Sequence, residues 1–319
     1  TFVFAIERGT PEPLTEHRTK AAVPFAGKYR VIDFALANCL HSGLRQILVL
    51  TQYKSHSLHK HLRDAWSVFN PELCEYITPL APQMRNGEDW YRGVLDALRQ
   101  NRYLIERRQC DHVLLLDGGV VYRMDYAELI RAHREQGAAV TCALRKAGCE
   151  GAAQARVRLQ CDAEERIVDI RDAVADDADF DAPMGVYLID KAVLLEEIDR
   201  LVEAELEAAA QAQGAANAIA GADLAMHLLP TLLEKHRVCG YRFGGERGRV
   251  TPDRYWSDLD STDAYFRANM ALLESAPPLD LYQPDWNILT YQGQYPPART
   301  VPGPVSGTEG IFVNSMLAA

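Results

Sequence analysis

Short apolar runs alternate with segments of helical periodicity through the first two-thirds of the chain. Residues 46–51 (QILVLT) and 112–116 (HVLLL) have the length of strands but lack the regular polar alternation of a half-exposed strand. Residues 32–42 and 93–107 instead place apolar side chains at helical spacing. Strands buried on both faces and separated by helices are typical of a mostly parallel sheet. The pattern predicts a doubly wound α/β fold that binds ligands beyond the carboxyl ends of its strands.

The remainder of the chain shows a different sequence pattern. Residues 156–161 and 166–170 alternate like antiparallel strands, and residues 191–220 are rich in alanine and glutamate, which favour helix. Prolines become frequent after residue 275, as in a linker, and residues 310–316 are again apolar and strand-like. These boundaries predict three parts: a domain over residues 1–275, a linker over 276–309, and the start of a C-terminal domain at 310–319.

Composition excludes several classes of protein. The 319 residues are 48% hydrophobic and 24% charged, which is a globular rather than a disordered balance. No apolar run approaches the roughly 18 residues that cross a bilayer, and no basic segment precedes a long apolar stretch at the start. We therefore predict neither a transmembrane helix nor a signal peptide. The net charge of −10 opposes binding to a polyanion, so nucleic acid is the least favoured partner.

The seven cysteines are an odd number, are scattered, and contain no Cys-x-x-Cys pair. A zinc site of paired thiolates is therefore not expected, and a disulfide framework would leave one thiol over. Single cysteines in apolar surroundings are typical of small buried side chains. These features favour the reducing environment of the cytoplasm.

Five motifs are more specific than composition explains. They read AGKYRVIDFALAN at 26–38, TQYKSHSL at 51–58, DWYRG at 89–93, YWSD at 255–258 and AYFRAN at 264–269. In this order and spacing the chain resembles the glucose-1-phosphate adenylyltransferase (ADP-glucose pyrophosphorylase) family from residue 1 to about residue 300. The resemblance implies a Rossmann-like nucleotidyltransferase fold with a mixed, mostly parallel sheet. It also implies that residues 310–319 begin a left-handed β-helix.

Members of this family join ATP and glucose 1-phosphate into ADP-glucose and pyrophosphate, which supplies glycogen or starch synthesis. The resemblance thus implies ATP, glucose 1-phosphate or ADP-glucose as ligands and Mg²⁺ as the family cofactor. It also implies an oligomer, either of identical chains or with an active paralogue. The reaction needs backbone N–H groups at the phosphates, basic side chains, and carboxylates that hold the metal.

The glycine-rich phosphate loop of the family is altered here. The family reads AGGxGTRL after its first strand, whereas this chain has Ile6 and Glu7 in place of two glycines and a loop that is one residue shorter. The new side chains occupy space that phosphate contacts need, Glu7 adds repulsive charge, and Pro11 and Pro13 remove N–H donors. A variant loop with the same task is the alternative. The nucleotide-binding candidates that remain in the loop are Arg8, Gly9 and Thr10.

One of the two metal-binding carboxylates of the family is missing. The family strand ends LAGDHIY, and residues 116–122 read LDGGVVY, so Gly119 replaces the catalytic aspartate. Asp117 lies two residues earlier, roughly 6.5 Å away at the rise of a strand, which predicts a poor substitute. The second carboxylate is retained as Asp258. One ligand of two predicts a weak Mg²⁺ site, so we do not carry the cofactor over to this chain.

The sugar-phosphate side has also changed. The family motif FVEKP aligns with residues 170–174 (IRDAV), so its lysine is Ala173. Arg171 is two residues away, and we expect its guanidinium to point elsewhere. Three sugar-phosphate candidates remain, Tyr122, Gly185 and Tyr187, and the strand that carries the last two suits a sheet core equally well.

Other family positions survive. By resemblance, Lys20 faces the phosphates as a catalytic group, with a solvated surface lysine as the alternative. Gln52, Tyr91 and Gly93 are nucleotide-binding candidates, and Gln52 and Trp90 belong to the region that transmits effector binding. Ordinary packing at a helix start explains the aromatic pair equally well.

Three parts of one mechanism have changed, whereas the surrounding framework has not. We therefore predict a catalytically impaired family member that acts as a regulatory or structural subunit. Two alternatives remain open. One is an active sugar-phosphate nucleotidyltransferase with a rearranged site, and the other is a sensor that binds a sugar phosphate or nucleotide.

Overall fold

The computed structural model describes residues 1–6, 12–83, 90–147, 157–173, 180–211 (side chains to 203), 224–245, 248–250, 253–291 and 315. Within these ranges, no helix combines the length and apolar character needed to cross a bilayer. No disulfide joins any two of the described cysteines. Most of the residues expected to begin a β-helix lie outside these ranges.

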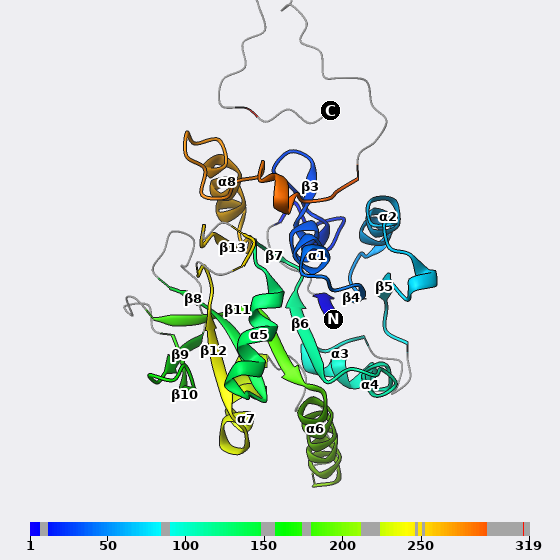
Figure 1. Cartoon of the computed structure of the whole chain (residues 1–319). Coiled ribbons are helices and arrows are strands. Elements are labelled where there is room, and N and C mark those ends of the chain that lie inside the picture. The colour runs from blue at the N-terminus through cyan, green and yellow to red at the C-terminus, as the bar shows by residue number, and fades with distance from the viewer. Residues whose placement is uncertain are drawn as a thin grey trace, which may run out of the picture.

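A nine-stranded mixed sheet forms the centre of the molecule (Figure 1). Its main path runs β10-β9-β11-β6-β1-β4-β5, and β8 joins β11 to β12. The neighbours β6, β1, β4 and β5 are parallel, as are β8 and β12, whereas β11 is antiparallel to β6, β8 and β9. The strands are β1 (Phe2–Ala5), β4 (Gln46–Thr51), β5 (Tyr76–Leu80), β6 (His112–Asp117), β8 (Val140–Lys146), β9 (Val157–Cys161), β10 (Ile167–Asp172), β11 (Asp181–Asp190) and β12 (Val238–Arg242).

Helices cover both faces of this sheet, as the apolar runs predict. Val3 and Leu116 pack in one hydrophobic core with α1, α2 and α5, whereas Phe4 and Leu115 pack in a second core with α3, α4, α6 and α7. The Rossmann-like α/β fold is thereby confirmed. The helices are α1 (Val31–His41), α2 (His56–Ala65), α3 (Val94–Gln100), α4 (Arg102–Glu106), α5 (Tyr126–Gln136), α6 (Lys191–Gln211), α7 (Leu229–Lys235) and α8 (Thr262–Ala271).

Two local expectations differ from the structure. The single helix predicted over 93–107 is broken at Asn101, whose side-chain amide donates to the Ala97 carbonyl and so competes with the helical backbone. The first part of the predicted linker packs against the domain, because Leu279 and Trp286 are buried. The Trp286 indole N–H donates to Asn38 Oδ1 at 3.0 Å. Packing against the domain therefore extends into the predicted linker, at least to Ile288.

A small two-stranded sheet stands above the carboxyl end of β6 (Figure 1). It pairs β7 (Val120–Tyr122) with β13 (Trp256–Asp258) in antiparallel register, so that Asp258 lies opposite Val120. This pairing brings a late segment of the chain to the end of the central sheet, where a doubly wound fold is expected to bind its ligands.

Candidate functional site

The site forms where β1 and β6 end side by side. Phe4 pairs with Asp117, and the Gly118 N–H donates to the Phe4 carbonyl at 2.9 Å. The short 3-10 helix η1 (Lys20–Ala22) is tied to the same edge, because the Thr19 hydroxyl donates to the Ala5 carbonyl at 3.3 Å. Backbone pairing thus brings Lys20, Gly119 and Asp258 together, although they are far apart in the sequence.

Lys20 lies at the centre of this group. Its side chain is buried, and its ammonium donates to the Asp258 carboxylate. A Cβ added to Gly119 would lie 3.2 Å from Lys20 Cδ and 3.4 Å from Lys20 Cε. The lysine stem therefore borders the space that the family aspartate would enter. A solvated surface lysine is excluded for this position.

Asp117 reaches closer to Gly119 than the strand-rise argument predicts. Its Oδ1 accepts a hydrogen bond of 2.7 Å from the Gly119 N–H and would lie 3.2 Å from a Cβ on Gly119. The value of roughly 6.5 Å describes backbone displacement along a straight strand, whereas β6 ends at Asp117 and the chain turns through Gly118 and Gly119, so that the Asp117 side chain reaches Gly119. The expectation that Asp117 is remote from the missing aspartate is corrected accordingly.

These groups do not fit the Mg²⁺ site that the family uses. A magnesium ion needs carboxylate oxygens that are open to it. The aspartate at position 119 is absent, and the Asp258 carboxylate is already neutralised by the Lys20 ammonium. Asp117 accepts the backbone hydrogen bond of Gly119.

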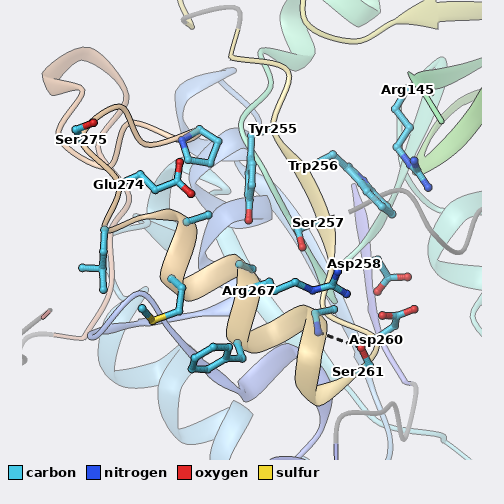
Figure 2. Close-up of a pocket in the computed structure, with 17 residues that line it drawn as sticks. Arg145, Tyr255, Trp256, Ser257, Asp258, Asp260, Ser261, Arg267, Glu274 and Ser275 are labelled. Carbon is cyan, nitrogen blue, oxygen red and sulfur yellow. Dashed lines mark hydrogen bonds between the residues drawn. The ribbon is translucent and has the colours of Figure 1, made fainter. Parts of the chain in front are cut away.

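A cavity of about 820 Å³ adjoins Asp258 between β13 and α8 (Figure 2). Its volume falls in the range of small-molecule sites. Arg145, from β8, stacks over the Trp256 ring at 4.0 Å, and the Trp256 indole N–H donates to the Met184 carbonyl at 3.1 Å. Asp258, Asp260 and Arg267 also line the cavity, which therefore combines charged groups with an aromatic wall.

Sequence reasoning did not single out Arg145 or Trp256 as site residues. Trp256 lies in the YWSD motif, so the motif could have indicated it. Arg145 sits in an apolar strand, and its charge there was the only available signal. Neither residue could be connected to the other before the fold placed β8 near β13.

Two of the sugar-phosphate candidates are core residues in the structure. Tyr122 is fully buried, and its hydroxyl shares a 2.5 Å hydrogen bond with the Tyr126 hydroxyl. Burial raises the pKa of Tyr122, so the phenol stays protonated. Tyr187 is also buried, in the second hydrophobic core. Neither tyrosine offers a surface to a sugar phosphate in this conformation.

Gly185, the third candidate, packs directly against Asp117. Its φ of +81° is a conformation that favours glycine, and an added Cβ would lie only 2.8 Å from Asp117 Cβ. Glycine is therefore required to hold the carboxyl end of β6 in place. Arg171 pairs with Asp169 and is exposed on β10, which agrees with the expectation that it points elsewhere. Ala173 directly follows that strand.

The nucleotide and effector candidates form a second group at the end of β4. Gln52 follows β4, and its amide donates to the Tyr91 carbonyl at 3.0 Å. Tyr91 is buried, and its hydroxyl accepts a hydrogen bond from the Asn101 amide, whereas Trp90 is 55% exposed. Gly93 has φ +143° and precedes α3. Arg8, Gly9 and Thr10 lie outside the described residues, as does Glu7.

Comparison with known proteins identifies the family of the chain. A family model described as nucleotidyl transferase matches residues 12–275. The chain is 46% identical over 306 residues to glucose-1-phosphate adenylyltransferase 2 of Vibrio vulnificus, with 96% of this chain and 74% of the relative covered. It is 36% identical over 295 residues to glucose-1-phosphate adenylyltransferase of Shewanella frigidimarina, with 90% and 67% covered. The chain belongs to the glucose-1-phosphate adenylyltransferase family of nucleotidyl transferases.

Proposed function

We propose that this chain keeps the ligand-binding framework of its family but is impaired in Mg²⁺-dependent nucleotidyl transfer, and that it acts as a regulatory or structural subunit. The observation that supports this most directly is the Lys20–Asp258 ion pair beside Gly119. It replaces an arrangement of two carboxylates and a metal with one carboxylate and an ammonium group.

The chemical consequence follows from what the transfer needs. Attack on the α-phosphorus of ATP develops charge on the phosphate oxygens, and catalysis depends on positioning and on fixed charge at those oxygens. A lysine supplies one positive charge and rotatable donors. It does not clamp the phosphate in a fixed coordination geometry as a metal does. Slow or absent turnover is the expected result.

Ligand binding does not require the same parts. The cavity beside Asp258 presents Arg145 stacked on Trp256, and Arg267 adds a second cation to its lining. Such a cavity suits a phosphorylated sugar or a nucleotide, because cations bind phosphate and an aromatic face stacks on a ring. By family relationship the ligands are ATP, glucose 1-phosphate or ADP-glucose. A subunit that binds them without turnover can report on their concentration.

An active enzyme with a rearranged site is the second candidate, and the position of Asp117 favours it. Its Oδ1 lies 3.2 Å from the place where a side chain at 119 would begin. If Asp117 left the Gly119 N–H and Lys20 left Asp258, two carboxylates would flank the same point. Asp117 would then take the role of the missing aspartate.

Pyrophosphate release from ATP, Mg²⁺ and glucose 1-phosphate separates the two candidates. The full chain and its Asp117→Asn variant are assayed beside an intact family enzyme as positive control. The impaired subunit gives background release in both proteins. The rearranged enzyme gives turnover that falls about 100-fold or more in Asp117→Asn.

Calorimetric titration of the same proteins with ATP, ADP-glucose and glucose 1-phosphate tests the binding half of the proposal. Binding without turnover supports the regulatory subunit. If no ligand binds, only a structural role survives, and co-purification with an active paralogue becomes its test. The matched variant Arg145→Gln removes the cation that faces Trp256 and should weaken binding of a phosphorylated ligand.

A further inference from the structure

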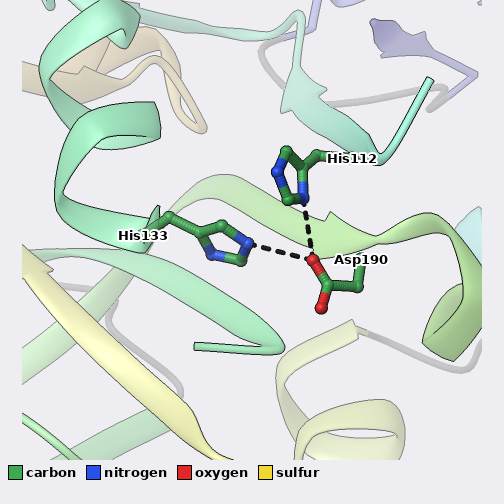
Figure 3. A group of neighbouring side chains, drawn as sticks. All are labelled: His112, His133 and Asp190. Carbon is green, nitrogen blue, oxygen red and sulfur yellow. Dashed lines mark hydrogen bonds and ion pairs between the residues drawn. The ribbon is translucent and has the colours of Figure 1, made fainter. Parts of the chain in front are cut away.

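The opposite end of β6 carries a group of side chains that the proposed function does not use. His112 is the first residue of β6, Asp190 is the last residue of β11, and the register of the two strands pairs them directly. His133 reaches the same point from α5 (Figure 3). His112 Nδ1 lies 2.8 Å from Asp190 Oδ1, and His133 Nε2 lies 3.2 Å from the same oxygen. Three residues from three elements thus converge on one point.

The His133 ring is held in a fixed orientation, and the His112 ring packs against it. His133 Nδ1 lies 2.8 Å from the Thr141 hydroxyl, so its Nε2 is turned toward Asp190. The rings of His112 and His133 meet edge to face at 4.8 Å between centroids. A histidine whose second nitrogen is held by an oxygen has the outer-shell support typical of metal ligands.

Among the described residues, the Asp190 carboxylate has no lysine or arginine partner and pairs only with the two histidines. If the His133 proton is on Nδ1 and donated to Thr141, the lone pair of Nε2 faces a carboxylate oxygen. A cation between them would satisfy both groups.

We propose that His112, His133 and Asp190 form a binding site for a divalent transition metal ion of the zinc class. Two imidazoles and one carboxylate are a ligand set that such ions accept. Ligands about 2.0–2.1 Å from a tetrahedral zinc lie about 3.3 Å from one another, close to the 2.8 and 3.2 Å observed. All three ligand atoms lie within 4.8 Å of one another, so small side-chain movements close the site.

The cluster is also accessible. The side chains of His112 and Asp190 are 21% and 36% exposed, whereas His133 is 1% exposed. The open side gives the ion an entry path and leaves room for water to complete its coordination. A bound ion would tie α5 to β6 and β11. Its expected role is structural, at the opposite end of β6 from the cleft, and it does not depend on the proposed function.

Zinc binding by the full chain tests the proposal. Metal-depleted protein is titrated with Zn²⁺ by calorimetry, and the bound metal is counted by elemental analysis after gel filtration. The test variants are His112→Gln and Asp190→Asn. In the second, the amide oxygen can still accept hydrogen bonds from both rings, so an ion-free network would survive. His56→Gln changes an exposed histidine on α2 and is the matched control.

The wild type and the control should bind one equivalent of Zn²⁺ more than either test variant. All these proteins keep the seven cysteines, so zinc held by thiolates cancels in the comparison. Thr141→Val, which removes the oxygen that orients His133, should weaken binding about 10–100-fold. At a free Zn²⁺ concentration about 100-fold above Kd, the melting temperature should rise by about 4 °C in the wild type. It should not rise in Asp190→Asn.

Equal stoichiometry in the wild type, His112→Gln and Asp190→Asn would overturn the proposal and leave a hydrogen-bonded His–Asp–His cluster. Melting without metal shows whether each variant is folded. Because the His112 ring is partly exposed, His112→Gln is the safer variant if Asp190→Asn does not fold. Neither result bears on nucleotidyl transfer, so this proposal and the proposed function fail independently.

Discussion

The two ends of β6 differ in how they handle negative charge. At the carboxyl end, Asp258 forms an ion pair with the Lys20 ammonium. At the amino end, Asp190 contacts two imidazole rings and, among the described residues, forms no ion pair with a lysine or arginine. In the two proposals above, the first arrangement disfavours the metal that the family uses, and the second provides a site for one. On these proposals, the partner of a carboxylate, rather than its presence, decides which ion the site can hold.

Packing explains the positions of the groups that contact Asp258 and Asp190. The lack of a side chain at Gly119 leaves the stem of Lys20 in van der Waals range of that position. At the other end, strand register alone places His112 beside Asp190, and the Thr141 hydroxyl orients His133. The carboxyl end thus depends on a missing side chain, whereas the amino end depends on backbone pairing.

The largest expected effect comes from rebuilding the carboxyl end. Restoring the glycine pair at Ile6 and Glu7 with the loop arginine, together with Gly119→Asp and Ala173→Lys, should raise pyrophosphate release above background. Each restored contact is expected to contribute roughly 2–4 kcal/mol to the transition state. Gly119→Asp alone should do little, because orientation and charge act together in phosphoryl-type transfer.

The matched control carries asparagine instead of aspartate at position 119 in the otherwise rebuilt chain. It keeps the shape but lacks the charge that a metal needs, so it should stay near background. If the rebuilt and folded chain is silent, the cleft has diverged beyond these named positions. Zinc binding at the amino end should be the same in all of these variants.

A smaller effect is expected from Gly185→Ala, which strains the carboxyl end without changing its charge. The added Cβ would lie 2.8 Å from Asp117 Cβ at a φ of +81°. Strain and overlap together should lower the free energy of unfolding by about 3 kcal/mol, measured by denaturant titration.

Two other glycines calibrate that value. Gly137 has φ +57° with nothing near its Cβ position, so Gly137→Ala reports the backbone term alone, about 1 kcal/mol. No atom lies within 4 Å of the Cβ position of Gly245, and its φ is not positive. Gly245→Ala should therefore change the free energy of unfolding by less than about 0.5 kcal/mol. Equal losses in Gly185→Ala and Gly137→Ala would refute the close approach to Asp117.

The sequence predicted the sheet but not the contacts at its ends. Residues 46–51 and 112–116 could be identified as strands because an apolar run buried on both faces needs no knowledge of its neighbours. The pairing of His112 with Asp190 joins residues 78 positions apart, and only the antiparallel register of β6 and β11 creates it. Local pattern contains no information on that register.

The candidate site was predicted in part for the same reason. The motifs identified Lys20, Gly119 and Asp258, which the structure brings together. They could not show that Tyr122 faces the core, because one strand exposes alternate residues to different surroundings. The reach of Asp117 depended on the turn after β6, which a strand-based distance ignores.

The last expected effect, no larger than that of Gly185→Ala, concerns an acid that is buried with a cation nearby but not in close contact. Asp253 precedes β13, and burial raises its pKa to about 6, although Arg123 Nη1 at 3.6 Å opposes the shift. The usual aspartate pKa is about 3.9, so between these values the folded protein binds a proton that the unfolded chain releases. Its contribution to stability is therefore fully present at low pH and is lost as the pH rises through about 6, by about 1.4 kcal/mol per pH unit within that window.

Asp253→Asn does not titrate, so its stability relative to the wild type should improve from pH 4 to pH 7 in denaturant titrations. Asp285→Asn, at an exposed position, is the matched substitution for effects unrelated to burial. A constant difference between Asp253→Asn and the wild type over this range would show that Arg123 satisfies Asp253 as fully as Lys20 satisfies Asp258, and the contrast between the acids would then lose its basis in contact distance.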